Sequence, residues 1–226
     1  MLIHPWDAAG DDEWRAWLTT QQVGTLIAPG HDRDVPVVVP THFSYDGADT
    51  VLLHLARPNP VWAALEERPR ALLSVSGDWA YVPAAWKAIG AEDPALGIPT
   101  SYYAAAILDC TAEVLTGDDL LEILRTQLGD FEPGSAVADP AVHARRLSGI
   151  RGLRLTVTSV QAKVKVGGNA DDAHRARVLE GLRERGGPGD EGAAGHLLRR
   201  TPLEDTWSRK ARTTERYSSG SSTKVM

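Results

Sequence analysis

Two histidines lie on either side of a turn signal in the first third of the sequence. His42 follows a valine-rich run, and His54 comes twelve residues later, with Asp46-Gly47 between them. An Asp-Gly pair between two apolar runs is typical of a β-hairpin, so we expect the two imidazoles to lie near each other in the folded chain. The pair is therefore a candidate binding site.

The residues just after His54 add a candidate phosphate site. Asn59-Pro60 predicts the start of a short helix that runs through Glu67. The first N–H groups of a helix have no partner within it and suit a phosphate, and Arg57 would add a fork of further donors. An ordinary hairpin with polar residues on its solvent face explains the same residues, and this alternative stays open.

Aromatic residues gather around the stretch 84–99, which is rich in proline and glycine and is expected to be a long loop. Planar side chains near a phosphate site suit a flat heteroaromatic ligand. Aromatic residues also serve protein cores and dimer interfaces, so the pattern does not decide between a ligand site and packing. The residues are Trp62, Trp79, Tyr81, Trp86, Tyr102 and Tyr103.

Several familiar sites are missing from the sequence. It contains no phosphate-binding P-loop, no G-x-G-x-x-G motif after a strand, no G-x-S-x-G nucleophile elbow and no H-E-x-x-H motif. The seven histidines are scattered, so no metal site is predicted. Cys110 lies within an apolar run and is expected to be a small core residue.

The elements that position these residues are mostly short strands. Few helices separate the early strands, which predicts an α+β fold built on a small antiparallel barrel. Helices are expected at the start, in the middle and near the end of the chain. The expected strands are 23–28, 35–45, 50–55, 71–76, 79–82, a strand within 100–115, and 153–166 with a bulge near Ser159; the expected helices are 11–18, 60–67, 118–128, 140–147 and 171–185.

Composition and charge restrict the class of protein. The chain has 226 residues, 42% of them hydrophobic, and no run of eighteen apolar residues that could span a membrane. The first residues do not have the basic start and apolar middle of a signal peptide, and only one cysteine is present, so we expect a cytoplasmic location. The net charge of −6 divides into −10 for residues 1–195 and +4 for residues 196–226. DNA contact through the acidic part is therefore not expected, and the basic end is the candidate for it.

These residues, in this order, resemble the PaiB family of FMN-binding proteins, part of the flavin-binding split-barrel group that includes the pyridoxamine phosphate oxidases. The most specific match is His54–Trp62, which fits the family form H-x-A-x-x-N-P-x-W. The resemblance covers about residues 1–186. Further matching stretches are Gly24-Thr25-Leu26, Pro40-Thr41-His42, Trp79–Trp86, Val160–Lys165 with Asn169, and Gly181-Leu182-Arg183.

The resemblance implies a split β-barrel of the FMN-binding type with flanking helices over 1–186. Outside the resemblance, the glycine-rich and Ser/Thr/Arg-rich composition of 187–226 predicts a flexible basic tail. The resemblance also implies a homodimer with FMN at the interface. The phosphate would lie near Arg57 and Asn59, the ring along residues 39–42, and further aromatic side chains would wall the pocket, from the partner chain in one arrangement. No catalytic residue is assigned. The implied cofactor-binding residues are Val39, Pro40, Thr41, His42, His54, Arg57, Asn59, Trp62, Trp79, Tyr81 and Trp86.

The sequence and the resemblance leave three candidate functions open. The first is a PaiB-type FMN-binding protein, a family associated with negative regulation of transcription. The second is a flavin-dependent oxidoreductase acting on a small molecule, with 84–99 as a lid. The third is a dimeric scaffold that has lost flavin, because the sequence departs from the family in two segments. Ser101-Tyr102-Tyr103 replaces the usual W-N-Y, and Val166-Gly167-Gly168 replaces L-S-Q.

Overall fold

The computed structural model describes residues 1–200. The chain divides into two compact units. The first unit contains Met1–Gly77 and Tyr103–Val164, and the second contains Asp78–Tyr102 and the residues from Lys165 on. Each unit is described by itself below.

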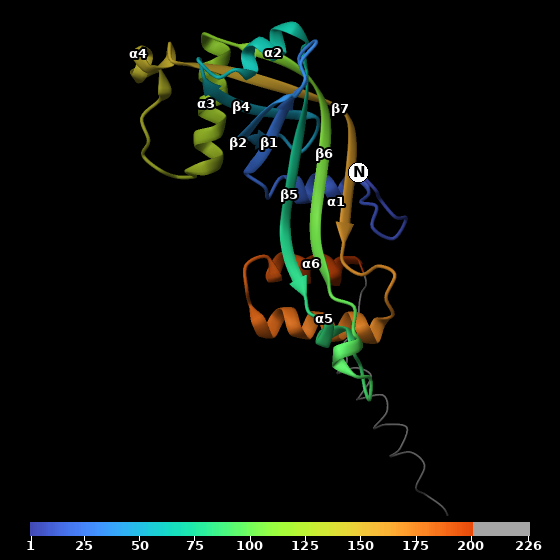
Figure 1. The fold of residues 1–226 in the computed structure, drawn as a ribbon. Coiled ribbons are helices and arrows are strands. Elements are labelled where there is room, and N and C mark those ends of the chain that lie inside the picture. Colours follow the sequence, from blue (N-terminus) through green and yellow to red (C-terminus); the bar gives the residue numbers. More distant parts are fainter. Residues whose placement is uncertain (201–226) are drawn as a thin grey trace, which may run out of the picture. The chain divides into compact units, whose positions relative to one another are not determined.

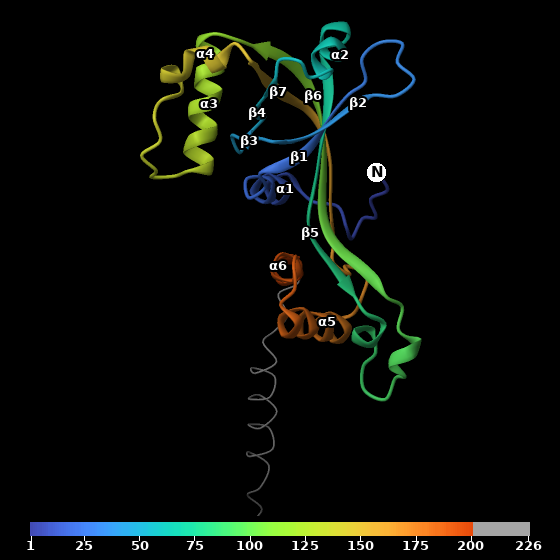
Figure 2. The ribbon, with the colours of Figure 1, turned by 60° about the vertical axis from the view of Figure 1, so that its left-hand side comes forward.

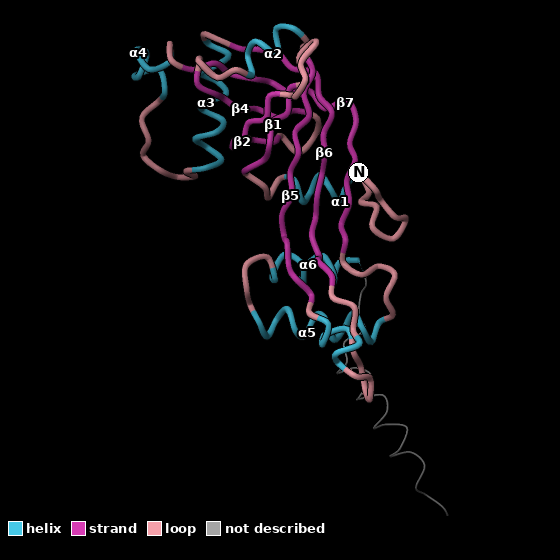
Figure 3. The backbone as a smooth tube through the Cα atoms, in the orientation of Figure 1, coloured by secondary structure: helices cyan, strands magenta, loops and turns pink. Residues whose placement is uncertain are grey.

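Seven strands form one antiparallel sheet in the order β2-β1-β5-β6-β7-β4-β3, which confirms the predicted split β-barrel fold. The outer strands β2 and β3 have no hydrogen-bonded neighbour on their free sides within the sheet. The strands, which Figures 1 and 3 trace, are β1 (Val23–Ala28), β2 (Val37–His42), β3 (Ser44–Tyr45), β4 (Thr50–Ala56), β5 (Arg70–Val82), β6 (Thr100–Leu115) and β7 (Ile150–Lys165).

The core of the first unit follows from alternation along its strands. Val51 and Leu53 on β4 pair with Leu155 and Leu153 on β7, and all four side chains are fully buried. Residues two apart on a strand share one face, so the alternating apolar positions line the barrel interior. Four helices flank this unit, and α3 packs against β4 (Figure 1). They are α1 (Asp11–Leu18), α2 (Val61–Glu67), α3 (Asp118–Phe131) and α4 (Ala144–Leu147), with a 3₁₀ turn at Pro140–His143.

The second unit is built on two helices, α5 (Asp172–Arg185) and α6 (Asp190–Arg200), which pack side by side (Figure 2). Asp171 caps α5, because its side chain accepts a hydrogen bond from the N–H of His174 at 3.0 Å. Leu182 of α5 and Leu197 of α6 are both buried. Two 3₁₀ turns, Ala84–Lys87 and Pro94–Leu96, lie in the stretch expected to be a loop.

Several local expectations differ from the structure. The single strand expected over 35–45 is two strands, β2 (Val37–His42) and β3 (Ser44–Tyr45), which are separated at Phe43. Gly77-Asp78 was expected to separate two strands, yet β5 is continuous through it. Asp78 adopts a left-handed φ of 53°, so the chain absorbs the irregularity in one residue without ending the strand. The tail expected from residue 187 includes α6 over 190–200, because apolar side chains there find a buried surface. The rest of that tail, residues 201–226, lies outside the described part of the chain.

Two smaller expectations concern Cys110 and the membrane. Cys110 is fully buried on β6, as expected of a core residue. Burial, together with the nearby charge of Asp109, raises the pKa of its thiol to about 12, which makes it a poor nucleophile. None of the helices within residues 1–200 is both long enough and apolar enough to cross a membrane.

Candidate functional site

The two histidines come together, as the hairpin signal predicted. β3 and β4 pair antiparallel across the Asp46-Gly47 turn, with Ser44 opposite Leu52. His42 at the end of β2 and His54 on β4 then meet with ring centroids 5.1 Å apart in an edge-on arrangement. Phe131 at the end of α3 also meets His42 edge-on, at 5.4 Å. A strand end, a neighbouring strand and a helix end therefore converge on one cluster of rings.

Gln127 is the buried polar residue of this cluster. Its side-chain oxygen accepts a hydrogen bond from Nδ1 of His54 at 2.6 Å, which fixes a proton on that nitrogen. Gln127 is only 3% exposed, and its Nε2 has no hydrogen-bond partner. A buried amide donor without a partner is unfavourable, so this atom marks a place where a ligand oxygen or a water would be stabilised.

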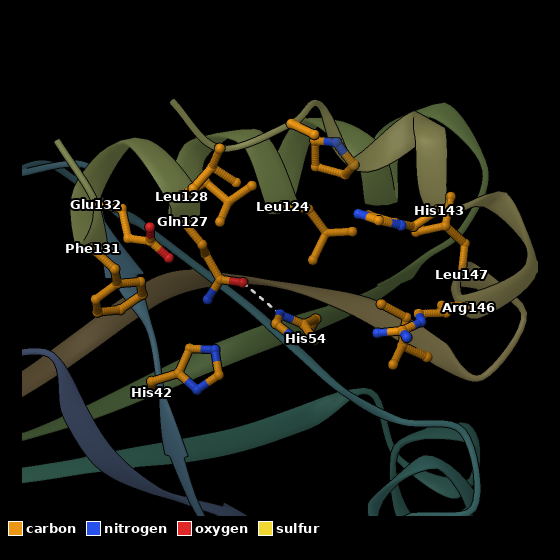
Figure 4. A pocket seen from close by; sticks show the side chains of 14 residues that line it. His42, His54, Leu124, Gln127, Leu128, Phe131, Glu132, His143, Arg146 and Leu147 are labelled. Carbon is orange, nitrogen blue, oxygen red and sulfur yellow. Dashed lines mark hydrogen bonds between the residues drawn. The ribbon is translucent and has the colours of Figure 1, made fainter. Parts of the chain in front are cut away.

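A cavity of about 410 Å³ opens above the histidines, and we call it the helix-side cavity (Figure 4). Its floor is formed by the two histidines, and its wall by one face of α3 and the segment that leads to β7. Positions 124, 127, 128 and 131 recur at the three- and four-residue spacing of a helix face. The lining residues are His42, His54, Leu124, Gln127, Leu128, Phe131, Glu132, Val137, Ala138, Pro140, His143, Arg146, Leu147 and Ile150.

The electrostatics of the cavity floor favour neutral imidazole at His42. Burial lowers the pKa of His42 from its ordinary value, and the neighbouring charge of His54 lowers it further. The His42 imidazole is therefore neutral near pH 7 and able to accept a proton or a hydrogen bond.

Arg57 is held in place by the segment that precedes β7. Its Nε donates to the carbonyl oxygen of Ser148 at 2.6 Å, and its backbone N–H donates to Gly149 at 2.8 Å. Within residues 1–200 no further partner is found for its two terminal nitrogens. A guanidinium fixed at one edge and open at the other is well suited to grip a phosphate.

The start of α2 offers fewer free donors than the sequence suggested. The Asn59 side chain accepts from the N–H of Val61 at 3.0 Å, and Pro60 has no N–H. The helix spans only seven residues. Trp62 is buried, and its indole N–H donates to the carbonyl of Ala56 at 2.9 Å, so the ring anchors the helix to the end of β4. Arg57 is thus the stronger phosphate candidate in this turn.

The strand expected to carry the flavin ring, β2, is one of the two edge strands of the sheet. Val39, Pro40 and Thr41 pair on one side with Leu26, Thr25 and Gly24 of β1. No other strand of the described chain pairs with the outer side of β2. A flavin carries alternating donors and acceptors along one edge of its ring, and a free strand edge presents backbone N–H and C=O groups to it, with Pro40 contributing only its C=O. The donor set of this strand and Arg57 therefore fits FMN.

The three remaining predicted residues lie in the second unit. Trp79 and Tyr81 share one face of β5 and are 58% and 45% exposed, while Ala80 and Val82 are buried on the other face. Trp86 is packed more closely, because its ring lies against Gly181 and under the guanidinium of Arg185 at 4.6 Å. The exposed pair is free to contact a ligand or a partner, and Trp86 stabilises α5.

The two segments that depart from the family pattern meet in the second unit. Gly167 has a φ of +70°, and a Cβ placed there would lie 2.3 Å from the hydroxyl oxygen of Tyr102. Tyr102 is fully buried, so its ring occupies space that a side chain at 167 would need. Tyr102 and Gly167 therefore pack directly against each other, and the absence of a side chain at 167 leaves room for the hydroxyl of Tyr102.

Sequence reasoning missed Gln127, Phe131 and Arg146. The only available signal was Gln127, a polar residue on the apolar face of a predicted helix. Within residues 1–200, no three His, Cys, Asp or Glu side chains are grouped closely enough to hold a metal ion.

Comparison with known proteins gives a consistent picture. A family described as "Putative FMN-binding domain" matches residues 2–159. The protein named protease synthase and sporulation protein PAI 2, from Bacillus subtilis strain 168, is 26% identical over 172 residues, which is 73% of this chain and 80% of that protein.

Two solved structures share the fold. The flavocytochrome Anf3 from Azotobacter vinelandii superposes with a TM-score of 0.53 at 21% identity, over 76% of this chain and 75% of that one. An FAD and heme binding protein from Mycobacterium smegmatis also gives a TM-score of 0.53 at 21% identity, over 75% and 78% of the two chains. At this identity the likeness concerns the fold alone.

Proposed function

Because the chain belongs to the FMN-binding domain family that matches its residues 2–159, we propose that it is a flavin-dependent oxidoreductase acting on a small molecule in the helix-side cavity. Its cofactor is FMN, and its resemblance to the PaiB family is confirmed by the family match and the Bacillus relative. The observation that carries the enzyme proposal is a pair of imidazoles at the floor of an apolar cavity of organic-ligand size.

In this proposal the first unit holds the cofactor through two groups. The two terminal nitrogens of Arg57 bind the phosphate, and the free edge of β2 from Val39 to His42 binds the ring. Trp62 keeps α2 and the end of β4 together behind the phosphate site. Asn59 orders the turn by capping Val61 and is a positioning residue in this arrangement.

When bound, FMN supplies transfer of a hydride or of single electrons. The residues of this chain supply the proton and the dry environment. His42, held neutral by burial, is placed to accept a proton at an imidazole nitrogen, and His54 is oriented by Gln127. The apolar face of α3, with Leu124 and Leu128, excludes water from the histidines.

The proposal includes a homodimer with FMN at the interface. Its support is the exposed apolar surface on β1 and β2, where Val23 and Val38 are 64% and 55% exposed. In the dimer, Trp79 and Tyr81 of a partner chain would wall the flavin pocket. Sedimentation analysis with and without FMN tests this part, and a monomer at micromolar concentration in both cases would contradict it.

The phosphate assignment is tested by Arg57→Ala. The loss of two charge-assisted hydrogen bonds is expected to weaken FMN binding by about ten- to a hundredfold with an unchanged melting temperature of the FMN-free protein. Arg68→Ala, at an exposed arginine just after α2, is the matched control and should retain wild-type FMN affinity. Fluorescence titration of FMN measures both variants. Equal affinity in Arg57→Ala and wild type would overturn the assignment.

The redox role is tested separately. FMN-loaded protein is mixed anaerobically with NADH or NADPH, and loss of the oxidised flavin absorbance supports an oxidoreductase. A spectrum that neither nucleotide changes would count against an enzyme that draws electrons from the nicotinamide pool.

A negative transcriptional regulator, the role associated with the PaiB family, is the second candidate. Its support is family membership and the +4 net charge of residues 196–226, most of which lie outside the described part of the chain. Salt-sensitive DNA binding that disappears when 201–226 are deleted would favour this function. The flavin-free scaffold is set aside, because the matched family is an FMN-binding domain and the two departing segments pack against each other at Tyr102 and Gly167.

A further inference from the structure

The helix-side cavity separates its apolar and polar groups along its length. Leu124 and Leu128 of α3 and the ring of Phe131 belong to its apolar wall, and the cavity holds about 410 Å³. A site of this size and character takes a small organic molecule with one or two rings. Flat rings also pack favourably against Phe131 and the edge-on imidazole of His42.

A positively charged side chain, that of Arg146, lies at the end of the cavity that is formed by α4. Arg146 lines the cavity, and its side chain has neither an ion pair nor a hydrogen bond with any residue in 1–200. Three other arginines of this unit are paired with carboxylates: Arg125 with Asp139, Arg151 with Glu66 and Arg154 with Glu113. An unpaired guanidinium at the mouth of an apolar cavity favours a ligand with a carboxylate.

The opposite part of the cavity offers a neutral donor. The Nε2 of the buried Gln127 has no partner, while the oxygen of the same side chain is taken by His54. Figure 4 shows Gln127 between Phe131 and His54, with Arg146 toward the other end of the cavity. The charged guanidinium of Arg146 and the neutral amide of Gln127 are separated by apolar wall, and together they restrict the shape of a ligand that contacts both.

We propose that the helix-side cavity binds a planar aromatic carboxylic acid as the substrate of this protein. The carboxylate pairs with Arg146, the ring packs against Leu128 and Phe131, and an acceptor oxygen at the far end of the ring takes the free N–H of Gln127. His42 and His54 then face the bound ring from the floor of the cavity. This inference rests on the proposed oxidoreductase function, which it extends by naming a substrate class.

The test uses the full-length protein loaded with FMN and two probes of equal shape. Isothermal titration at pH 7 compares 2-naphthoate with the neutral 2-naphthalenemethanol. The acid is expected to bind about tenfold more tightly, because only the acid pairs with Arg146. Arg146→Ala should remove this difference. Arg145→Ala, at the neighbouring exposed arginine that does not line the cavity, should preserve it.

A second variant tests the location. Leu128→Trp fills the middle of the cavity and should abolish binding of both probes, while FMN affinity and the melting temperature stay near wild type. If the variant does not fold, Leu124→Phe provides a smaller obstruction with the same expected direction. Binding of either probe to a folded, obstructed variant with wild-type affinity would overturn the location.

Three results would overturn the proposal. The first is equal affinity for the acid and the alcohol in wild type, and the second is no binding of the acid at millimolar concentration. The third is release of FMN by 2-naphthoate, which would show that the cavity holds the flavin and would leave the FMN assignment intact. If the protein fails to bind FMN, the proposed function is refuted instead. The same titration on FMN-free protein would then still show whether the cavity binds the aromatic acid.

Discussion

The helix-side cavity of the first unit contrasts with a larger cavity in the second unit. The second one, which we call the loop-side cavity, holds about 600 Å³ between the 3₁₀ turns and the start of α5. Its carboxylates are already used by its own backbone. Glu92 accepts from the N–H of Ile89, Asp93 from that of Ala95, and Asp171 from that of His174, at 2.9 to 3.0 Å.

This difference shows that a buried polar group without a hydrogen-bond partner identifies a binding site better than the volume of a cavity does. In the loop-side cavity the carboxylates order the chain that carries them. The helix-side cavity is lined by Gln127, whose buried amide donor Nε2 has no hydrogen-bond partner. Tyr102 and Arg175 also contain unpaired buried atoms, but neither side chain lines the loop-side cavity. Three substitutions test this contrast, beginning with the one of largest expected effect.

Asp190 represents a fully satisfied buried group of the second unit. It is 1% exposed and accepts hydrogen bonds from Nε and a terminal nitrogen of Arg185 and from the N–H of Gly187. Asp190→Ala is expected to lower the free energy of unfolding by about 3 kcal/mol, because it leaves a partly buried guanidinium without its partner. Urea denaturation measures the change. Glu191→Ala, at the next and exposed position, should stay within about 0.5 kcal/mol of wild type.

The same pair makes stability depend on pH. The guanidinium of Arg185 holds the pKa of Asp190 below its ordinary value, and the N–H of Gly187 lowers it further. The stabilisation is therefore complete above the unfolded-state pKa of about 3.9 and is lost as the pH falls through the lower folded-state pKa. The stability difference between wild type and Asp190→Asn should shrink below about pH 4. A difference that stays constant down to pH 2 would contradict the charged pair.

Gly167→Ser is expected to have the next largest effect. Residue 167 has a left-handed backbone, and its new Cβ would meet the hydroxyl of Tyr102, so we expect a loss of about 2 kcal/mol. Gly186→Ser is the matched control, because its φ is +55° with open space around it, and it should cost only about 1 kcal/mol. Urea unfolding measures each variant.

The loss in the double variant Tyr102→Asn with Gly167→Ser should be about 1 kcal/mol smaller than the sum of the two single losses, because the clash at residue 167 is absent once Tyr102 is replaced. The double variant restores the residues that the family usually carries at both positions. Strictly additive losses would mean that the two segments changed independently, and the flavin-free scaffold would regain its support.

Much of the first unit could be predicted from short-range patterns. The strand 23–28 was predicted at its observed bounds, and the Asp46-Gly47 signal was enough to bring His42 and His54 together. These features depend on residues close in the sequence, where turn chemistry and alternation dominate. The split-barrel type of the fold and the FMN cofactor were predicted from the family resemblance, because hydrophobic periodicity alone does not indicate either of them.

The remaining features depend on long-range packing. Gln127 lies 73 residues from His54, and nothing in the sequence says which strand α3 will cover. The helix α6 was expected to be part of a tail because its glycine-rich approach looks like a linker. Its stability comes from burial of Ala193 and Leu197 and from the Asp190–Arg185 pair, all of which need the folded unit.

Gln127→Leu is expected to have the smallest effect of the three, although Gln127 is nearly as buried as Asp190. Only the hydrogen bond with His54 is lost, since Nε2 has no partner to lose, and we expect about 1 kcal/mol in urea unfolding. Asp130→Leu, at an exposed position of the same helix, corrects for helix propensity. A loss of unfolding free energy as large as that of Asp190→Ala would mean that Nε2 of Gln127 has a hydrogen-bond partner. The contrast between the two cavities, which depends on this atom, would then be wrong.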